Sequence, residues 1–208
     1  MRKLLVLILL VSTASYSASL KGITETGDEV LLKDDGTWSY LNPSEVEPEI
    51  TELNSKKFTK LLKNSFAVKS KKNKSEVWID AKRWSFEKSQ SGATEYEFEL
   101  KGEDVYAMMI NESIEMELES LANVAFENAR EAAPDTKIIH KEYRYVNGKK
   151  MIFLQMNGTM SGMKFSYLGY YYSNSSGITQ LIAYTGTALV DKYRSDMEDF
   201  LNGLMIRE

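Results

Sequence analysis

Four β-strands joined by short turns are predicted for the C-terminal half of this 208-residue chain, over 136–146, 149–159, 163–173 and 178–185. The connecting segments are Asn147-Gly148, Ser161-Gly162 and Asn174-Ser175-Ser176-Gly177. Gly and Asn tolerate the positive φ that tight hairpins require, and Asn-Gly between two strands predicts a two-residue type I′ turn. This stretch therefore predicts an antiparallel, up-and-down meander.

The stretch 95–101 alternates apolar and charged residues, which is typical of a strand with one face buried and the other in water. The predicted buried residues are Tyr96, Phe98 and Leu100. The predicted solvated residues are Glu95, Glu97, Glu99 and Lys101. Because no apolar neighbour shares the strand face of the three glutamates, we interpret them as a water-facing surface. Further strands are predicted over 76–80, 84–87 and 104–110.

Apolar residues recur at helical spacing in three other segments. Between 112 and 133 they form one stripe, which consists of Ile114, Leu118, Leu121, Ala125, Ala129 and Ala132. This spacing predicts an α-helix that starts near Ser113 and stops at Pro134. A second amphipathic helix is predicted over 188–206 and a short one over 55–63. The order of strands, helix, four strands and helix indicates the α+β class.

The N-terminus has the pattern of a secretory signal peptide. Arg2 and Lys3 precede an eight-residue apolar run, Leu4 to Val11, and small residues follow through Ala18. Cleavage is expected after Ala14 or Ser17. The apolar run is far shorter than the roughly 20 residues of a membrane-spanning helix. The pattern predicts a bacterial protein that is exported, to the periplasm or into the medium, without a transmembrane segment after cleavage.

The segment between this leader and the main body contains turn signals and then prolines. Gly27-Asp28 and Asp34-Asp35-Gly36 predict a small β-meander. Pro43 and Pro48 stand among acidic residues, which favours an extended linker. The predicted organisation is a signal peptide over 1–18, the β-meander over 19–41, the linker over 42–56 and an α+β domain over 57–208.

Composition excludes several classes of protein. The chain has no cysteine, which excludes a lipid-anchored lipoprotein, a disulfide framework and thiolate zinc sites. Its net charge of −4 becomes −6 without Arg2 and Lys3, which argues against nucleic-acid binding. His140 is the single histidine, and no serine-nucleophile elbow, His-Glu-x-x-His motif or phosphate-binding glycine loop is present. We therefore predict no catalytic residue, no metal site and no cofactor.

The chain resembles the PsbP-like superfamily in the order of its elements and in three segments. These are Val77-Trp78-Ile79-Asp80-Ala81-Lys82-Arg83-Trp84, the Asn147-Gly148 hairpin and Phe200-Leu201-Asn202-Gly203-Leu204. The superfamily includes bacterial DcrB-like envelope proteins and eukaryotic Ran-binding Mog proteins, and the likeness spans about residues 57–206. It implies an antiparallel sheet flanked by helices, and an accessory, chaperone or binding role without chemistry. A cystatin-like or nuclear-transport-factor-like fold is the rival architecture.

Aromatic residues are the first group of candidate binding residues. Four tyrosines crowd one predicted strand, namely Tyr167, Tyr170, Tyr171 and Tyr172. Alternation places Tyr167 and Tyr171 on one face of the sheet and Tyr170 and Tyr172 on the other. Such tyrosines serve either as core packing or as the lining of a cleft or partner surface. In the N-terminal meander, Trp38 and Tyr40 share a strand face and dock either on the parent domain or on a partner.

Lysines are the second group. The segment Lys56–Arg83 contains ten basic residues against Glu76 and Asp80. Four of these lysines stand close together, at Lys69, Lys71, Lys72 and Lys74. This local excess of positive charge indicates either a solvated loop or contact with an anionic surface of the cell envelope.

The sequence predicts the strands and helices of a whole α+β domain but contains no catalytic motif. This favours an exported, non-enzymatic accessory or binding protein of the bacterial envelope, recognising a protein or an apolar ligand. One alternative is a carboxylate-dependent hydrolase acting on cell-wall or glycan material, which needs two acids that converge in a cleft. Another is a carrier of lipid or a different apolar ligand, which needs a closed cavity bordered by methionines and tyrosines.

Overall fold

The computed structural model describes residues 20–23, 29–32, 38–40, 52–90 and 92–207. The chain divides into two compact units, residues 1–50 and residues 51–208, which are taken separately here. The predicted signal peptide lies outside the described residues, as does most of the predicted linker. Both therefore remain predictions from sequence.

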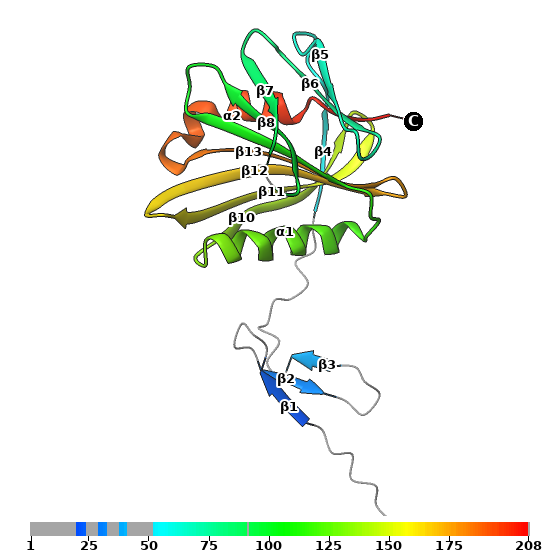
Figure 1. Ribbon diagram of the computed structural model, residues 1–208, viewed down its shortest axis with the longest axis vertical. Coiled ribbons are helices and arrows are strands. Elements are labelled where there is room, and N and C mark those ends of the chain that lie inside the picture. The colour runs from blue at the N-terminus through cyan, green and yellow to red at the C-terminus, as the bar shows by residue number, and fades with distance from the viewer. Residues whose placement is uncertain (1–19, 24–28, 33–37, 41–51, 91, 208) are drawn as a thin grey trace, which may run out of the picture. The chain divides into compact units, whose positions relative to one another are not determined.

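The first unit contains the predicted β-meander (Figure 1). Its strands are β1 (Leu20–Ile23), β2 (Glu29–Leu32) and β3 (Trp38–Tyr40). They pair antiparallel in the order β1-β2-β3, with Val30 opposite Tyr40. Val30 is buried in this small sheet, whereas Leu20 and Leu32 are exposed.

The second unit is built on an eight-stranded sheet in the order β4-β10-β11-β12-β13-β9-β8-β7 (Figure 1). These strands are β4 (Leu53–Phe58), β7 (Trp84–Lys88), β8 (Thr94–Leu100), β9 (Val105–Glu112), β10 (Lys137–Val146), β11 (Lys149–Met160), β12 (Met163–Asn174) and β13 (Gly177–Gly186). The four predicted consecutive strands are confirmed as β10 to β13, joined as an antiparallel meander.

The two predicted hairpins with Gly at the second position have the expected backbone. Asn147 and Gly148 have φ of 48° and 82°, and Ser161 and Gly162 have φ of 51° and 80°. Positive φ at both central residues is the signature of the type I′ turn, whose twist matches that of the flanking strands.

The strand β4 corrects two predictions. The spacing of Phe58, Leu61 and Leu62 predicted a helix over 55–63, but residues 53–58 form a strand that pairs in parallel with β10. Phe58 is buried, whereas Leu62 is 97% exposed, so the apolar spacing does not face a common core. The predicted linker therefore ends in a strand, and one pair of the sheet is parallel.

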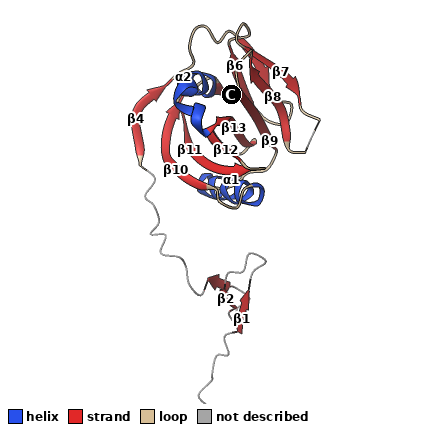
Figure 2. Ribbon diagram, turned by 90° about the vertical axis from the view of Figure 1, so that its left-hand side faces the viewer, coloured by secondary structure: helices blue, strands red, loops and turns tan. Residues whose placement is uncertain are grey.

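The two helices cover opposite faces of the sheet. Figure 2 shows a strongly curved sheet with α2 (Val190–Leu201) inside the curve and α1 (Leu118–Ala132) on the outer face. Under α1 lies a core cluster that includes Leu121, Leu154 and Tyr171. On the inner face, α2 packs over a larger cluster. The predicted α+β fold with helices on both sides of the sheet is confirmed.

The boundaries of both helices differ from the predictions. The first helix begins at Leu118, because β9 continues to Glu112 and Ile114 is exposed rather than part of the buried stripe. After the 3₁₀ turn η1 (Thr187–Leu189), α2 ends at Leu201. The remaining residues form a strand in a second sheet, whose order is β14 (Leu204–Ile206), β6 (Ser75–Ile79) and β5 (Phe66–Lys69).

Candidate functional site

Two of the four predicted tyrosines belong to the core. Tyr170 and Tyr171 are both 0% exposed, in the inner and outer clusters respectively, as strand alternation predicted. Burial raises the pKa of Tyr170 to about 12 and raises that of Tyr171 as well. Neither side chain can reach a partner at the surface. Tyr172 packs against the inner cluster and Tyr167 against the outer one, each partly buried.

Tyr167 is part of an aromatic row on the outer face. The strand register places it opposite Tyr184, and Tyr184 opposite Tyr106. Both pairs of ring centroids are 5.7 Å apart, and Phe165 lies 6.3 Å from Tyr167. We call these four residues the aromatic row. Ring separations of this size are favourable for tilted aromatic pairs.

The rings of the aromatic row remain partly open to solvent. Tyr106, on β9, is 37% exposed, and the helix α1 packs mainly on β11 and β12. Desolvation raises the pKa of Tyr106, Tyr167 and Tyr184 above the ordinary value for tyrosine. The three hydroxyl groups are therefore neutral near pH 7 and can donate hydrogen bonds.

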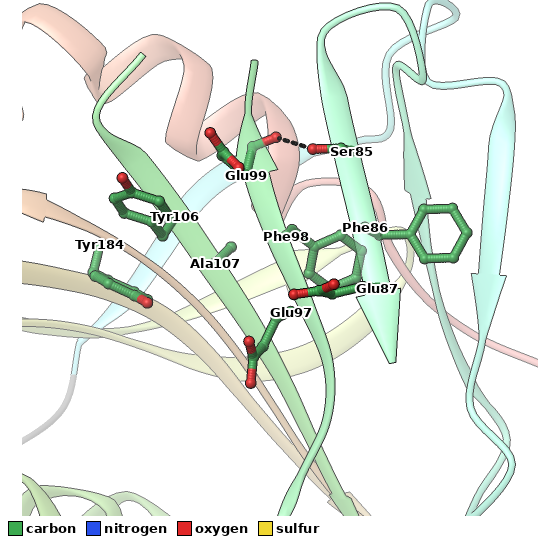
Figure 3. Close-up of a pocket in the computed structure, with 9 residues that line it drawn as sticks. All are labelled: Ser85, Phe86, Glu87, Glu97, Phe98, Glu99, Tyr106, Ala107 and Tyr184. Atoms are coloured by element: carbon green, nitrogen blue, oxygen red, sulfur yellow. Dashed lines mark hydrogen bonds between the residues drawn. The ribbon is translucent and has the colours of Figure 1, made fainter. Parts of the chain in front are cut away.

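Beyond Tyr106 the same face becomes acidic. The register places Glu99 opposite Tyr106 and Ser85 opposite Glu99, while Glu97 lies opposite Glu87. These side chains border a hollow of about 320 Å³, which we call the acidic hollow. Its lining residues are Ser85, Phe86, Glu87, Glu97, Phe98, Glu99, Tyr106, Ala107 and Tyr184. Figure 3 shows the two tyrosine rings side by side, with the ring of Phe86 turned away from them.

An apolar hollow borders the same two tyrosines. It measures about 820 Å³ and is lined by Asp104, Tyr106, Met163, Lys164, Phe165, Tyr184, Gly186, Thr187, Ala188 and Leu189. Met163 is 59% exposed at the β11–β12 hairpin. Tyr106 and Tyr184 thus form a ridge between a hollow with carboxylates and a hollow with apolar side chains. An extended segment lying across this ridge would contact both.

The sequence did not identify Tyr106, Tyr184 or Phe165 as site residues. The three belong to strands β9, β13 and β12, and they meet through pairing of segments far apart in the chain. Alternation within 104–110 was visible, but it did not show which strand would be the neighbour. The only indication in the sequence that Tyr106 and Tyr184 could be site residues was that both are aromatic and stand on strands predicted to be half buried.

Glu95 corrects the prediction of a solvated glutamate face. It is 5% exposed, whereas Glu97 and Glu99 are exposed as predicted. The register of β8 against β9 shifts between Thr94 and Tyr96, which places Glu95 at a bulge and turns it away from the outer face. Its carboxylate accepts hydrogen bonds from Ser70 Oγ at 2.7 Å, from the Lys71 N–H at 2.7 Å and from Asn111 Nδ2 at 2.9 Å.

The predicted lysine cluster lies around the loop held by Glu95. Lys69, Lys71, Lys72 and Lys74 are all exposed, at the end of β5 and in the turn to β6. None of them forms an ion pair with another described residue. Lys72 Nζ donates to the carbonyl of Ala93 at 3.4 Å. The structure therefore brings the four lysines together on one loop, away from the two hollows.

The remaining candidates lie on other strands. Trp38 and Tyr40 lie on β3 of the first unit. His140 is half exposed, and its Nε2 lies 3.2 Å from Glu142 Oε2. Among the described residues, no three His, Asp or Glu side chains are arranged to hold a metal ion. No helix in the described part of the chain is long and apolar enough to span a bilayer.

Comparisons with known proteins concern the fold alone. A cyanobacterial PsbP from Synechocystis is similar with a TM-score of 0.54 at 13% identity, covering 68% of this chain and 92% of that one. A protein of unknown function from Pseudomonas aeruginosa is similar with a TM-score of 0.46 at 11% identity, and the match covers 69% of this chain and 97% of that one. A protein from Bacteroides thetaiotaomicron is similar with a TM-score of 0.44 at 7% identity, and the match covers 70% of this chain and 49% of that one.

No family model matches the sequence, and no curated protein matches it either. The cyanobacterial structure supports the PsbP-like fold relationship that the element order implied. The branch within that superfamily remains a prediction.

Proposed function

We propose that this chain is an exported, non-enzymatic accessory protein that binds a partner protein on the outer face of its large sheet. The observation that carries the proposal is the aromatic row, which extends from Tyr167 in the outer cluster to the partly exposed Tyr106 at the acidic hollow. Tyrosine combines a large apolar ring with a hydroxyl group and is enriched at protein interfaces for that reason. Export rests on the signal-peptide pattern of residues 1–18.

The chemistry of the two hollows defines the segment that fits them. Glu87, Glu97 and Glu99 favour basic side chains, and a cation can also lie over a tyrosine ring. Met163, Phe165 and Leu189 favour an apolar side chain in the neighbouring hollow. The matching partner presents a basic group and an apolar group on one extended segment.

Site-specific photo-crosslinking in cells tests this proposal. A photoreactive phenylalanine is placed at Tyr106 or Met163, and for comparison at Tyr145 or Val124, which are each 44% exposed elsewhere on the unit. We expect the same cross-linked product from positions 106 and 163 and none from 145 and 124. Equal products from all four positions, or no product from 106 and 163, would contradict the proposal.

The hydrolase alternative retains one supporting observation, because three carboxylates border the acidic hollow. Glu97 and Glu99 are two residues apart on a strand, so their backbones are about 7 Å apart, and both side chains lie on the same face. A glycosidase also needs one acid with a raised pKa. Release of fragments from peptidoglycan that is lost in both Glu97→Gln and Glu99→Gln would favour the hydrolase.

Within the described residues, neither the acidic hollow nor the apolar hollow is a closed apolar cavity of the kind that the carrier alternative needs. The described methionines divide between the packed core and the surface. Met109, Met151 and Met197 are 0% exposed within the inner cluster, while Met160 and Met163 are exposed. The hollows beside Tyr106 are bordered by exposed side chains.

A further inference from the structure

The turn between β5 and β6 presents four lysines that form no ion pair with another described residue. Lys69, Lys71, Lys72 and Lys74 are exposed, whereas the carboxylates beside them are internal. Glu95 is 5% exposed beneath the turn, and Glu76 is 6% exposed and accepts a hydrogen bond from Trp78 Nε1 at 2.7 Å. We call residues 69–74 the lysine loop. Its exposed side is therefore cationic while the nearby acids serve the interior.

The backbone of the lysine loop is held by a network of hydrogen bonds. Ser70 Oγ donates to Glu95 and accepts from the N–H groups of Lys72 and Asn73, at 3.0 and 3.2 Å. Asn73 Nδ2 donates to the carbonyl of Ile178 at 2.8 Å, which ties the loop to β13.

Neighbouring segments hold the outer carbonyls of the loop. Ser113 Oγ donates to the carbonyl of Lys72 at 2.8 Å, and the N–H of Arg207 donates to that of Lys74 at 2.8 Å. The loop is thus ordered before any ligand arrives, so that binding orders side chains alone.

We propose that the lysine loop docks this protein on a membrane surface that contains anionic phospholipid. Lysine carries a compact, hydrated charge, which suits attraction to a charged surface better than it suits the two-pronged recognition of a single phosphate. The loop lines none of the hollows described above, so its ligand contacts it from outside. It also carries no aromatic ring on which a nucleic-acid base could stack.

Vesicle co-sedimentation of the full chain tests the proposal. The probes are vesicles of phosphatidylcholine with and without 30% phosphatidylglycerol, at about 0.05 M salt. Each lysine near such a surface contributes on the order of a five-fold gain in binding. Replacing the four lysines by Gln is therefore expected to lower binding to the anionic vesicles by about 600-fold when all four contact the surface. Comparing variants of the full chain cancels the contribution of residues 1–18, which is common to all.

A charge-matched variant separates the loop from general electrostatics. It replaces four exposed lysines outside the loop by Gln, at Lys57, Lys82, Lys88 and Lys137. The proposal expects this variant to bind nearly as wild type does. Equal losses in both variants, or no binding of the wild type to anionic vesicles, would overturn it. Loss of wild-type binding in 10 mM inorganic phosphate at constant ionic strength would also overturn the proposal. Free phosphate competes with a site for a single phosphate group, but not with attraction to a whole charged surface.

Glu95→Gln tests whether the order of the loop matters. The change removes a negative charge near the lysines, so simple attraction predicts equal or tighter binding. However, the Lys71 N–H then donates to a neutral amide oxygen instead of a carboxylate. The weaker hydrogen bond makes the loop less ordered. We expect weaker binding by about three-fold, with thermal unfolding measured in parallel to show that the fold is kept. Tighter binding by a folded variant would overturn the role assigned to the network.

Discussion

Gly203 occupies the turn between α2 and β14, where a side chain has no room. A Cβ atom at this position would lie 2.1 Å from the carbonyl oxygen of Trp78 and 2.9 Å from that of Phe200. The N–H of Trp78 donates to the carbonyl of Gly203 at 2.9 Å, so the two backbones are already in contact. Moving them apart would break the pairing of β14 with β6.

We therefore predict that Gly203→Ala lowers the free energy of unfolding by about 3 kcal/mol, because backbone atoms must shift. Gly186→Ala is the matched control, since a Cβ there would meet its nearest atom at 3.9 Å. Urea unfolding measures both changes. A Gly203→Ala protein as stable as the control would contradict the close approach.

Arg144 and Glu142 form a buried ion pair on β10. The guanidinium lies 3.6 Å from the ring centroid of Phe153 and 4.3 Å from that of Phe58. Burial alone would raise the pKa of Glu142, but hydrogen bonds from Arg144 and Asn54 outweigh it, and the pKa is lowered. The group thus favours folding when ionised, and that contribution disappears as the pH falls through the lowered pKa.

A pH series of unfolding measurements tests this pair. At pH 7 we expect Glu142→Gln to be less stable by about 3 kcal/mol, the low end for breaking a buried ion pair, since Arg144 stays charged. Below the ordinary pKa of 4.5 the wild type progressively loses the same interaction, and the two stabilities converge. A gap of constant size from pH 7 to pH 3 would contradict the assignment.

Among the elements, α1 depends on very few side chains. Leu121, Ala122 and Ala125 are its buried residues, and Leu121 is 0% exposed. The helix has no side-chain N-cap, so its position derives from packing on β11 and β12. Small alanines allow its backbone to approach the sheet closely.

We predict that Leu121→Ala lowers the free energy of unfolding by about 3 kcal/mol, through lost burial and the cavity that remains. Val124→Ala changes a side chain that is 44% exposed on the same helix, and the expected loss is below about 0.5 kcal/mol. Chemical denaturation of the two variants measures the difference. Similar losses would mean that α1 is not anchored through Leu121.

For the molecule as a whole, the acidic and the basic side chains of the two proposed binding surfaces lie on different segments of the chain. The chain carries a net charge of −4, with glutamates at the acidic hollow and lysines on a loop that lines neither hollow. A protein partner and an anionic membrane surface can therefore be contacted through different residues. Variants of Tyr106 and of the lysine loop are expected to affect one contact without the other.

Export concerns the whole chain as well. The small residues after the apolar run predict a processed protein that begins at Ser15 or Ala18, without Arg2 and Lys3. Intact-mass measurement of the protein isolated from the cells that naturally produce it checks this. A mass near 23.7 kDa, that of the full chain, would contradict cleavage.

The local order of elements could be predicted from the sequence alone. The hairpins at Asn147-Gly148 and Ser161-Gly162, the strands around them and the faces of Tyr170 and Tyr171 all depend on a few neighbouring residues. Period, turn chemistry and the positive φ of glycine are local properties, so a short stretch of sequence determines them. The α+β class followed from their order.

Pairing between distant segments was decided only by the tertiary structure. The strand β9 pairs with β13 rather than with β10, the next strand in the chain, which aligns Tyr106 with Tyr184 and creates the candidate site. A bulge turns Glu95 inward, and the parallel pairing of β4 with β10 replaces a predicted helix. Each outcome depends on contacts between residues that are far apart in the chain. No local pattern contains that information.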